Sequence, residues 1–393
     1  EIQASDWSSD VCSSDLLPEE NELFAIEDLA VSKANATIPN FTAVRIDPVK
    51  HQIIAGDQSN RVIWVLDAAG KPKQQLENQD ALTYIEAWKG QYLFTFIGTT
   101  TQANPDVNGS IKTYASGAPS TLIKSLNRPI ELKARDLDGD GQDELISSEF
   151  GFMQGGMSVW KKNGTSWTKK VLNPQTGATH VDVRDFNGDG QLDIVALFAQ
   201  GDERIMLYTN KGGLNFEETR LLRFPSIYGT SSFDMGDVDG DGDLDIVCTA
   251  GDNADFSTIL KPYHGVYVYT NQGKMKFKQQ AFYPQNGATK VMLADLDQDG
   301  DQDMLSIALF PDVAKRPAEG LIYFNNTGKG FSQMTIPVNH LGRWSVMDIA
   351  DIEGDGDLDV VLGSHAVAKF PAGGFDPAWK TAKGILILRN KKR

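Results

Sequence analysis

The sequence predicts an all-β protein, a seven-bladed β-propeller built from four-stranded antiparallel blades. Three observations predict it: a short alternating strand occurs seven times, an acidic loop occurs five times, and no helical periodicity lies between them. Self-similarity at a period of about fifty residues is typical of arrays and propellers. Closure of the ring would leave no long sheet edge exposed.

The repeated strand is apolar at alternate positions and ends in a Gly/Asn-type turn, the pattern of a strand that leads into a hairpin. Because there are seven copies, we expect seven blades. The copies are RVIWVLDAAG from Arg61, GSIKTYASG from Gly109, GMSVWKKNG from Gly156, RIMLYTNKG from Arg204, GVYVYTNQG from Gly265, GLIYFNNTG from Gly320 and GILILRNKK from Gly384.

One unit, residues 178–220, shows the order of the elements. It runs ATHVDVRD, acidic loop, LDIVALFA, variable loop, RIMLYTN, KGG turn and LNFEETRLL. These are four short segments of period-2 alternation bounded by turn residues, so each unit predicts four strands.

The two ends of the chain complement each other. The last unit stops after its third strand, whereas residues 21–34, NELFAIEDLAVSKA, resemble the fourth strands FEETRLL and FKQQAFY. We therefore expect the N-terminal strand to complete the last blade, with residues 17–393 forming one propeller.

Residues 1–16 match nothing downstream, and residues 6–16, DWSSDVCSSDL, resemble the translation of a sequencing-library adapter. We interpret residues 1–16 as a non-native, disordered segment and exclude them from the fold. Without Cys12 only Cys248 is left, so no disulfide within the chain is expected.

The net charge is −16, which argues against nucleic acid and anionic membrane surfaces as partners. No run of 18 apolar residues occurs, so no membrane-spanning helix is expected. We expect a monomer.

Much of this negative charge lies in five acidic loops that align without gaps. Their starts are 49, 52, 58 and 56 residues apart. They are DLDGDGQDELI from Asp136, DFNGDGQLDIV from Asp185, DVDGDGDLDIV from Asp237, DLDQDGDQDML from Asp295 and DIEGDGDLDVV from Asp351.

Oxygen ligands without His or Cys suit a hard cation, and ligands at loop positions 1, 3, 5, 7 and 9 can wrap one Ca²⁺. An EF-hand is excluded because position 12 is never Glu and each loop runs into a strand. The expected ligand positions are Asp136, Asp138, Asp140, Gln142 and Glu144; Asp185, Asn187, Asp189, Gln191 and Asp193; Asp237, Asp239, Asp241, Asp243 and Asp245; Asp295, Asp297, Asp299, Asp301 and Asp303; Asp351, Glu353, Asp355, Asp357 and Asp359.

The motif D-x-[DN]-G-D-G-x-x-D-[IV]-[IV] in repeated four-stranded units resembles the FG-GAP/VCBS repeat family, including the integrin α-subunit propeller. The resemblance implies a calcium-binding hairpin in each loop, about five Ca²⁺ ions in all, with a structural role. Three departures are Glu144 at position 9 of the first loop, Gln298 in place of the first glycine of the fourth, and Glu353 at position 3 of the fifth.

The units differ most in the loops between strands 2 and 3 and between blades, which share the face opposite the calcium hairpins. Ligands commonly bind on such variable loops of a rigid scaffold. We expect a cationic and aromatic ligand face containing Arg128, His180, Tyr228, Lys290, Arg343, Trp344 and His365, with Tyr263, His264 and Trp379 beside them.

No nucleophile, phosphate-loop or zinc motif occurs, and the five histidines are scattered. The favoured hypothesis is a non-catalytic, calcium-stabilised propeller that binds a protein or glycan outside the cytoplasm, alone or as a domain of a larger secreted protein. The alternative is a polysaccharide lyase that uses Arg343, His180 and Tyr228.

Overall fold

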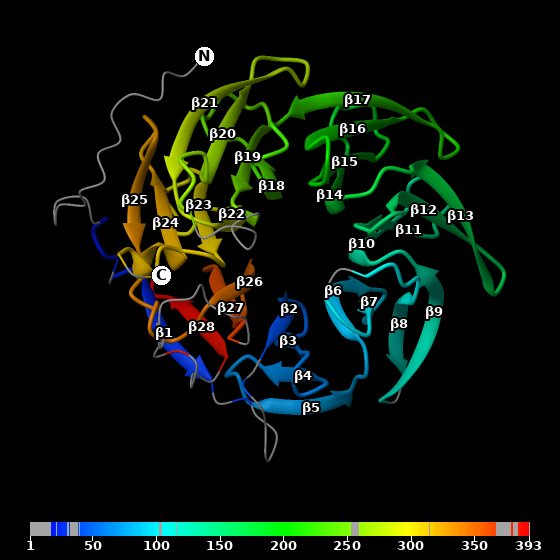
Figure 1. The fold of residues 1–393 in the computed structure, drawn as a ribbon, viewed down its shortest axis with the longest axis horizontal. Helices are drawn as coiled ribbons and strands as arrows, with labels where there is room; N and C mark the ends of the chain where they lie inside the picture. The colour runs from blue at the N-terminus through cyan, green and yellow to red at the C-terminus, as the bar shows by residue number, and fades with distance from the viewer. Residues whose placement is uncertain are drawn as a thin grey trace.

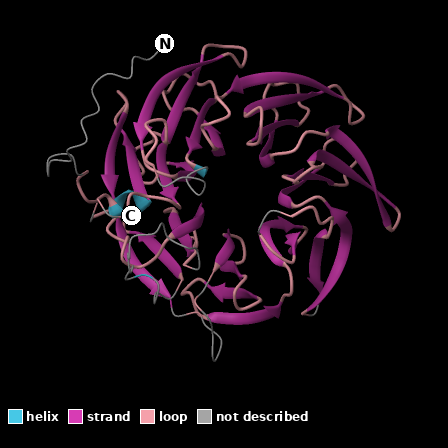
Figure 2. Ribbon diagram, in the orientation of Figure 1, coloured by secondary structure: helices cyan, strands magenta, loops and turns pink. Residues whose placement is uncertain are grey.

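The computed structural model describes residues 17–20, 22–29, 31, 38, 40–101, 104–115, 117–252, 259–313, 315–366, 379 and 384–392. Residues 1–16, which we interpret as non-native, lie outside this range. Seven four-stranded sheets are arranged in a ring (Figure 1). The described residues are almost entirely strand and connecting loop (Figure 2). The predicted seven-bladed propeller is confirmed.

In each of the first six blades, four consecutive strands pair antiparallel from the centre of the ring outward. The first three blades are β2 (Phe41–Asp47), β3 (Gln52–Asp57), β4 (Val62–Asp67) and β5 (Pro72–Glu77); β6 (Ala81–Trp88), β7 (Gln91–Gly98), β8 (Gly109–Ala115) and β9 (Ala118–Leu126); β10 (Pro129–Arg135), β11 (Glu144–Glu149), β12 (Gly156–Asn163) and β13 (Ser166–Asn173).

The next three blades repeat this arrangement. They are β14 (Ala178–Arg184), β15 (Asp193–Phe198), β16 (Arg204–Asn210) and β17 (Phe216–Arg223); β18 (Thr230–Gly236), β19 (Asp245–Ala250), β20 (Gly265–Asn271) and β21 (Phe277–Pro284); β22 (Ala288–Ala294), β23 (Asp303–Ala308), β24 (Leu321–Asn326) and β25 (Phe331–Thr335). A short 3₁₀ helix, η3 (Pro317–Gly320), precedes β24.

The seventh blade joins the two ends of the chain, as the sequence predicts. Its order is β26 (Trp344–Ala350), β27 (Asp359–Ser364), β28 (Ile385–Asn390) and then β1 (Phe24–Leu29). Strand β1 pairs antiparallel with β28, with Ile26 opposite Leu388. In Figure 1 the blue β1 lies beside the red β28.

The hydrophobic core lies between neighbouring blades. The second strand of a blade, such as β15, is buried throughout, whereas the outer β17 is mostly exposed. One core cluster joins Ile146 of β11 to Val181 of β14 and Ile194 of β15. Each blade therefore buries its faces against its neighbours, which is why a single four-stranded unit needs the ring.

Antiparallel order places the connections on two faces. The turns between first and second strands lie on one face, and the second-to-third and blade-to-blade loops lie on the other. The first two blades have tight turns, after Asp47 and after Trp88, where the other five have acidic loops.

Candidate functional site

The five acidic loops connect the first and second strands of the third to seventh blades, all on one face of the ring. In four loops, the first Asp accepts hydrogen bonds from the backbone N–H groups of positions 4, 5 and 6. Asp237 shows the pattern: Oδ1 accepts from Gly240 (2.8 Å) and Asp241 (3.2 Å), and Oδ2 accepts from Gly242 (2.9 Å). These bonds close the loop into a compact turn, as Asp side chains do in Asx turns.

The departure at Gln298 does not change the backbone of its loop. Position 4 has a positive φ in the other loops, for example 77° at Gly240, and Gln298 adopts φ 59°. This left-handed conformation is uncommon for a residue with a Cβ. The loop keeps its bonds from Asp299 and Gly300 to Asp295.

The ninth loop residue is buried at the start of the second strand. Asp303 is fully buried, and its Oδ2 accepts from the backbone N–H of Leu296 (3.1 Å). Burial raises the pKa of Asp303 to about 6, although bonds from Asn326 and Tyr323 oppose the shift. Burial raises the pKa of Asp193 and of Asp245 as well. A carboxylate in such surroundings is stabilised by a nearby cation.

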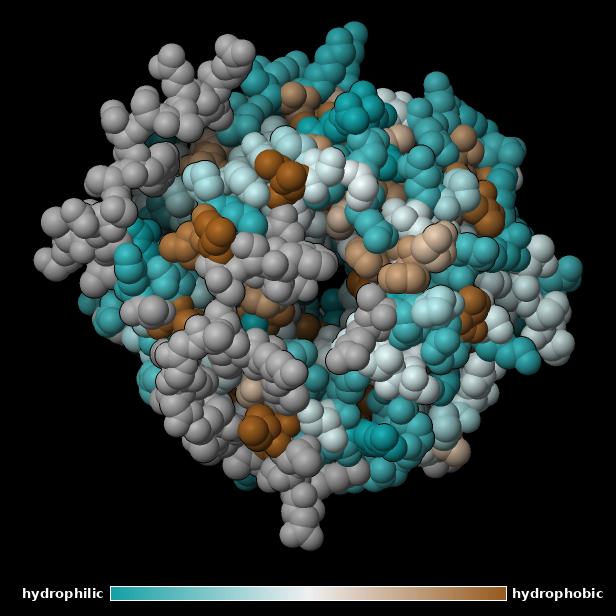
Figure 3. Space-filling model, viewed as in Figure 1, coloured by the Kyte–Doolittle hydropathy of each residue, from teal (hydrophilic) through white to brown (hydrophobic). Residues whose placement is uncertain are grey.

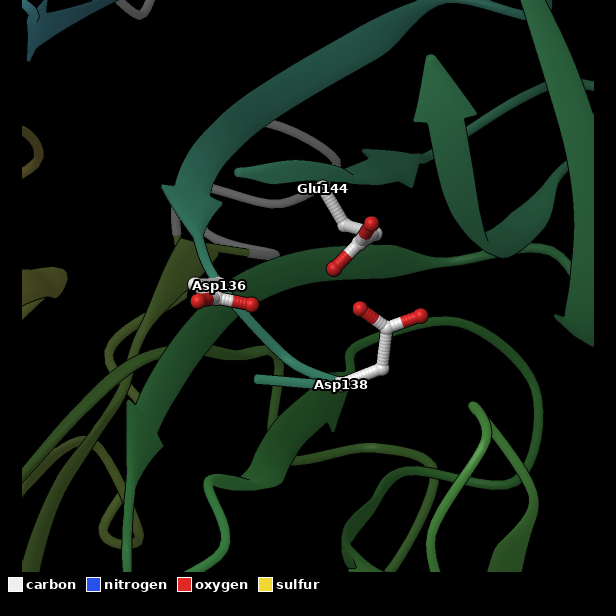
Figure 4. A group of neighbouring side chains, drawn as sticks. All are labelled: Asp136, Asp138 and Glu144. Atoms are coloured by element: carbon white, nitrogen blue, oxygen red, sulfur yellow. The ribbon is translucent and has the colours of Figure 1, made fainter. Parts of the chain in front are cut away.

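Carboxylate oxygens converge in four of the five loops, within 4.8 Å of one another. Figure 4 shows Asp136, Asp138 and Glu144 directed toward one another. The four groups are Asp136, Asp138 and Glu144; Asp237, Asp239 and Asp245; Asp295, Asp297 and Asp299; and Asp351, Glu353 and Asp359. The Asp185 loop, with Asn187 at position 3, is not among these carboxylate groups.

The residues of these clusters fit a hard cation. Asp297 Oδ1 is buried and has no hydrogen-bond partner among the described residues; Asp138 Oδ1 and Glu144 Oε1 have none either, but both side chains form ion pairs with Lys161. An unpaired buried carboxylate oxygen is unfavourable unless a cation neutralises it. Several acidic clusters can therefore hold a metal ion.

The remaining expected ligands lie outside these groups. Position 7 contributes its backbone N–H to position 5, as Asp243 does to Asp241 Oδ1 (2.9 Å). Its side chain belongs to none of the converging groups. Burial raises the pKa of Asp357 to about 6, with Asp355 as the next cause. Position 7 residues are Gln142, Gln191, Asp243, Asp301 and Asp357.

A repeated asparagine at the end of the third strand was missed in the sequence reading. Asn326 donates its backbone N–H to Asp303 (2.8 Å) and its side-chain amide to the Val238 carbonyl of the preceding blade (2.9 Å). Asn210 and Asn390 make equivalent cross-blade bonds. The sequence contains this repeat, because the third strands of four blades end in YTN, YTN, FNN and LRN.

On the opposite face, Arg343 and Trp344 line one cavity of about 190 Å³ beside the sixth and seventh blades. The Arg343 guanidinium donates from Nε to the Leu309 carbonyl (2.7 Å) and lies over the Phe310 ring at 5.0 Å. Burial lowers the pKa of Arg343 to about 10. Other lining residues are Pro311, Val313, Pro317, His340 and Trp379.

Trp344 is 2% exposed, and its Nε1 has no hydrogen-bond partner among the described residues. His365 is adjacent, because its backbone N–H donates to the Arg343 carbonyl (2.8 Å). Burial lowers the pKa of His365 to about 4, and Arg343 contributes. The structure thus brings Arg343, Trp344 and His365 together.

His180 and Lys290 lie inside strands β14 and β22, two residues after each strand begins, and not in the blade-to-blade loops. These inner strands surround the centre of the ring, which is hollowed in the space-filling view (Figure 3). His180 Nδ1 lies 2.7 Å from Glu131 Oε2, and Lys133 Nζ lies 2.8 Å from Glu131 Oε1. Lys290 donates to the Met347 carbonyl (2.7 Å), and burial lowers its pKa.

The other two expected ligand-face residues have separate surroundings. Tyr228 stacks on Tyr263, with ring centroids 5.2 Å apart, and on Tyr267 at 5.5 Å. Arg128 is buried and donates to the Thr101 carbonyl (2.9 Å). Neither residue lines the cavity beside Arg343.

The fold and the acidic hairpins define the class of protein. It is a β-propeller whose loops contain carboxylate clusters that can hold a metal ion. The family model of the FG-GAP-like repeat matches residues 136–196 and 185–248. The chain is a seven-bladed propeller containing FG-GAP-like repeats, so this part of the expected resemblance is confirmed. No curated protein sequence matches the chain significantly.

Among solved structures, the chain is similar to a catalytically inactive virginiamycin B lyase from Staphylococcus aureus with quinupristin. The TM-score is 0.57 at 10% sequence identity, over 93% of this chain and 99% of that chain. At this identity the likeness concerns the fold alone. Within the described residues, no helix has the length and apolar character needed to cross a membrane.

Proposed function

We propose that this protein is a non-catalytic, calcium-stabilised propeller that binds a ligand in the cavity beside Trp344, outside the cytoplasm. In this proposal the acidic loops bind calcium and thereby stabilise the propeller. Oxygen-only donors, buried carboxylates and the FG-GAP-like match support calcium as their metal. Loops of this kind suit the high calcium concentration found outside cells.

The single observation that carries the ligand site is the buried indole N–H of Trp344, which has no hydrogen-bond partner among the described residues and lies beside an apolar cavity. Trp379, Pro311 and Val313 supply the apolar lining, and the Arg343 guanidinium lies beside it. A sugar ring fits this chemistry, because its C–H face packs on aromatic rings and its hydroxyls accept from N–H groups. We therefore favour a glycan over a protein ligand.

Filling the cavity tests the site. Val313→Trp places a large ring in the cavity, whereas Val107→Trp places the same ring on an exposed surface. On a glycan array in calcium, wild type and Val107→Trp should bind the same glycan, and Val313→Trp should lose at least tenfold in affinity. Equal binding by all three proteins would exclude the cavity, and binding only to a protein would exclude the glycan.

The lyase alternative draws less support. His180 pairs with Glu131, Tyr228 stacks on tyrosines, and Arg343 lies beside Phe310. Of these three candidates, only Arg343 lines the cavity. The lyase-like neighbour adds no argument, since it shares the fold alone.

A further inference from the structure

In each of the five blades with an acidic loop, one position on the third strand faces that loop. The strand registers pair Leu145 with Trp160 and Val360 with Leu388, and the three blades between follow the same register. The next residue of the third strand therefore lies opposite the ninth loop residue. At this position stand Lys161, Thr209, Thr270, Asn325 and Arg389.

Lys161 places its ammonium among the carboxylates of the Asp136 loop. Its Nζ donates to Asp138 Oδ2, lies 2.8 Å from Asp140 Oδ2 and lies 3.7 Å from Glu144 Oε1. The lysine thus contacts the side chains of positions 3, 5 and 9, which are expected metal ligands. Glu144 Oε1, which has no hydrogen bond, is neutralised through this ion pair.

Arg389 takes the same place in the Asp351 loop. Its Nη1 lies 2.5 Å from Glu353 Oε1 and 3.7 Å from Asp359 Oδ2. Its Nε donates to Glu27 Oε2 of β1 (3.2 Å), and its Nη2 donates to the Ala68 carbonyl of the first blade. The guanidinium is held firmly, because the side chain is only 10% exposed.

The three other loops have no cation at this position. Among the described residues, the Asp185 and Asp237 loops make no ion pair. In the Asp295 loop, Asn325 donates to Asp297 Oδ2 (2.9 Å), and the half-exposed Lys392 approaches the same oxygen only to 3.9 Å. Thr and Asn are neutral and therefore place no counter-charge at this position of the third strand.

We infer that Lys161 and Arg389 are built-in cations that replace calcium in the Asp136 and Asp351 loops, so that only the three loops between them bind the metal. The inference rests on the proposed calcium binding. Calcium needs several of these oxygens at 2.3–2.6 Å, and a positive side chain at the same oxygens opposes its entry. The two filled loops are also the two with longer glutamates, Glu144 and Glu353.

Counting bound ions tests the inference on the full chain. The metal-free protein is titrated with Ca²⁺ alone by isothermal titration calorimetry, and folding is checked by circular dichroism. Wild type should bind three ions. Lys161→Thr, which introduces the residue of the second and third loops, should bind four. The reciprocal Thr270→Lys should bind two.

The outcomes separate the two proposals. Five ions on wild type would overturn the inference and leave the proposed calcium binding intact, whereas no binding would overturn both. If either variant fails to change its count in the stated direction while folded, the assignment of that side chain as a built-in cation is wrong. Arg389→Thr is not used, because Arg389 also holds the ring closure.

Discussion

The Asp136 loop and the Asp237 loop have almost the same backbone and different surroundings. Oδ1 of the first Asp accepts at 2.8 and 3.2 Å and Oδ2 at 2.9 Å in both loops. Lys161 enters one loop, whereas the neutral Thr270 faces the other. The turn is therefore set within the loop, and its counter-charge is set by a different strand.

This difference separates two functions of an acidic loop. Hydrogen bonds from its own backbone hold the first Asp, and this part needs no metal. Neutralisation of positions 3, 5 and 9 needs a cation, which the third strand can supply as a side chain. Under our proposal, one residue of β12 or β20 decides whether a blade depends on calcium.

Removal of calcium should cause the largest loss of stability, and the loss should differ between the five loops. At ten times Kd, each native-only site stabilises by about 1.4 kcal/mol, so three sites contribute about 4 kcal/mol. Chelator should lower the melting temperature, and hydrogen exchange should accelerate most at the Asp185, Asp237 and Asp295 loops. Equal acceleration at the Asp136 loop would contradict its neutralisation by Lys161.

The third blade contains a second group of interacting charges, around Glu131, which is separate from the charges of the Asp136 loop. Glu131 lies on β10, the strand that leads into the Asp136 loop, and is 3% exposed. Burial alone would raise its pKa, but His180 and Lys133 together hold the pKa of Glu131 well below its usual value of 4.5. This depressed pKa means that the folded state favours the carboxylate, so the resulting stability is present above about pH 4.5 and is lost as the pH falls.

Glu131→Gln should destabilise by about 3 kcal/mol at neutral pH, because it leaves Lys133 and the His180 imidazole without the carboxylate that pairs with both. The difference from wild type should shrink below about pH 4.5. Urea unfolding measures it, once in chelator and once in calcium. Because Glu131, Lys133 and His180 lie on the inner strands β10 and β14 and outside the acidic loop, the difference should be the same in both. A difference that appears only in calcium would assign Glu131 to the loop.

Much of the fold followed from local patterns. Alternation in segments such as RIMLYTN predicted the strands, and the unpaired third strand GILILRN predicted closure by residues near Phe24. The acidic loops were found because their contacts span fewer than ten residues. Such contacts can be derived from spacing alone.

The missed features depend on contacts between distant segments. Lys161 meets Asp138 across 23 residues, and Arg389 meets Glu27 across 362. Placing them requires the strand register and the closed ring, which periodicity does not specify. His180 and Lys290 were grouped with the variable loops, although both belong to the first strands of their blades, β14 and β22.

The smallest expected effect compares one glycine in each loop. Gly141 has φ 83° and Gly242 has φ 90°, and an added Cβ would meet no atom within 4 Å at either position. Alanine at either site therefore has only the left-handed backbone penalty, about 1 kcal/mol.

In chelator, urea unfolding should give the same loss of stability for Gly141→Ala and Gly242→Ala, since the two backbones match. In calcium the variants should diverge, because Gly242→Ala also weakens one metal site and Gly141→Ala affects a loop that Lys161 already neutralises. Equal losses in calcium would mean that both loops bind the metal alike.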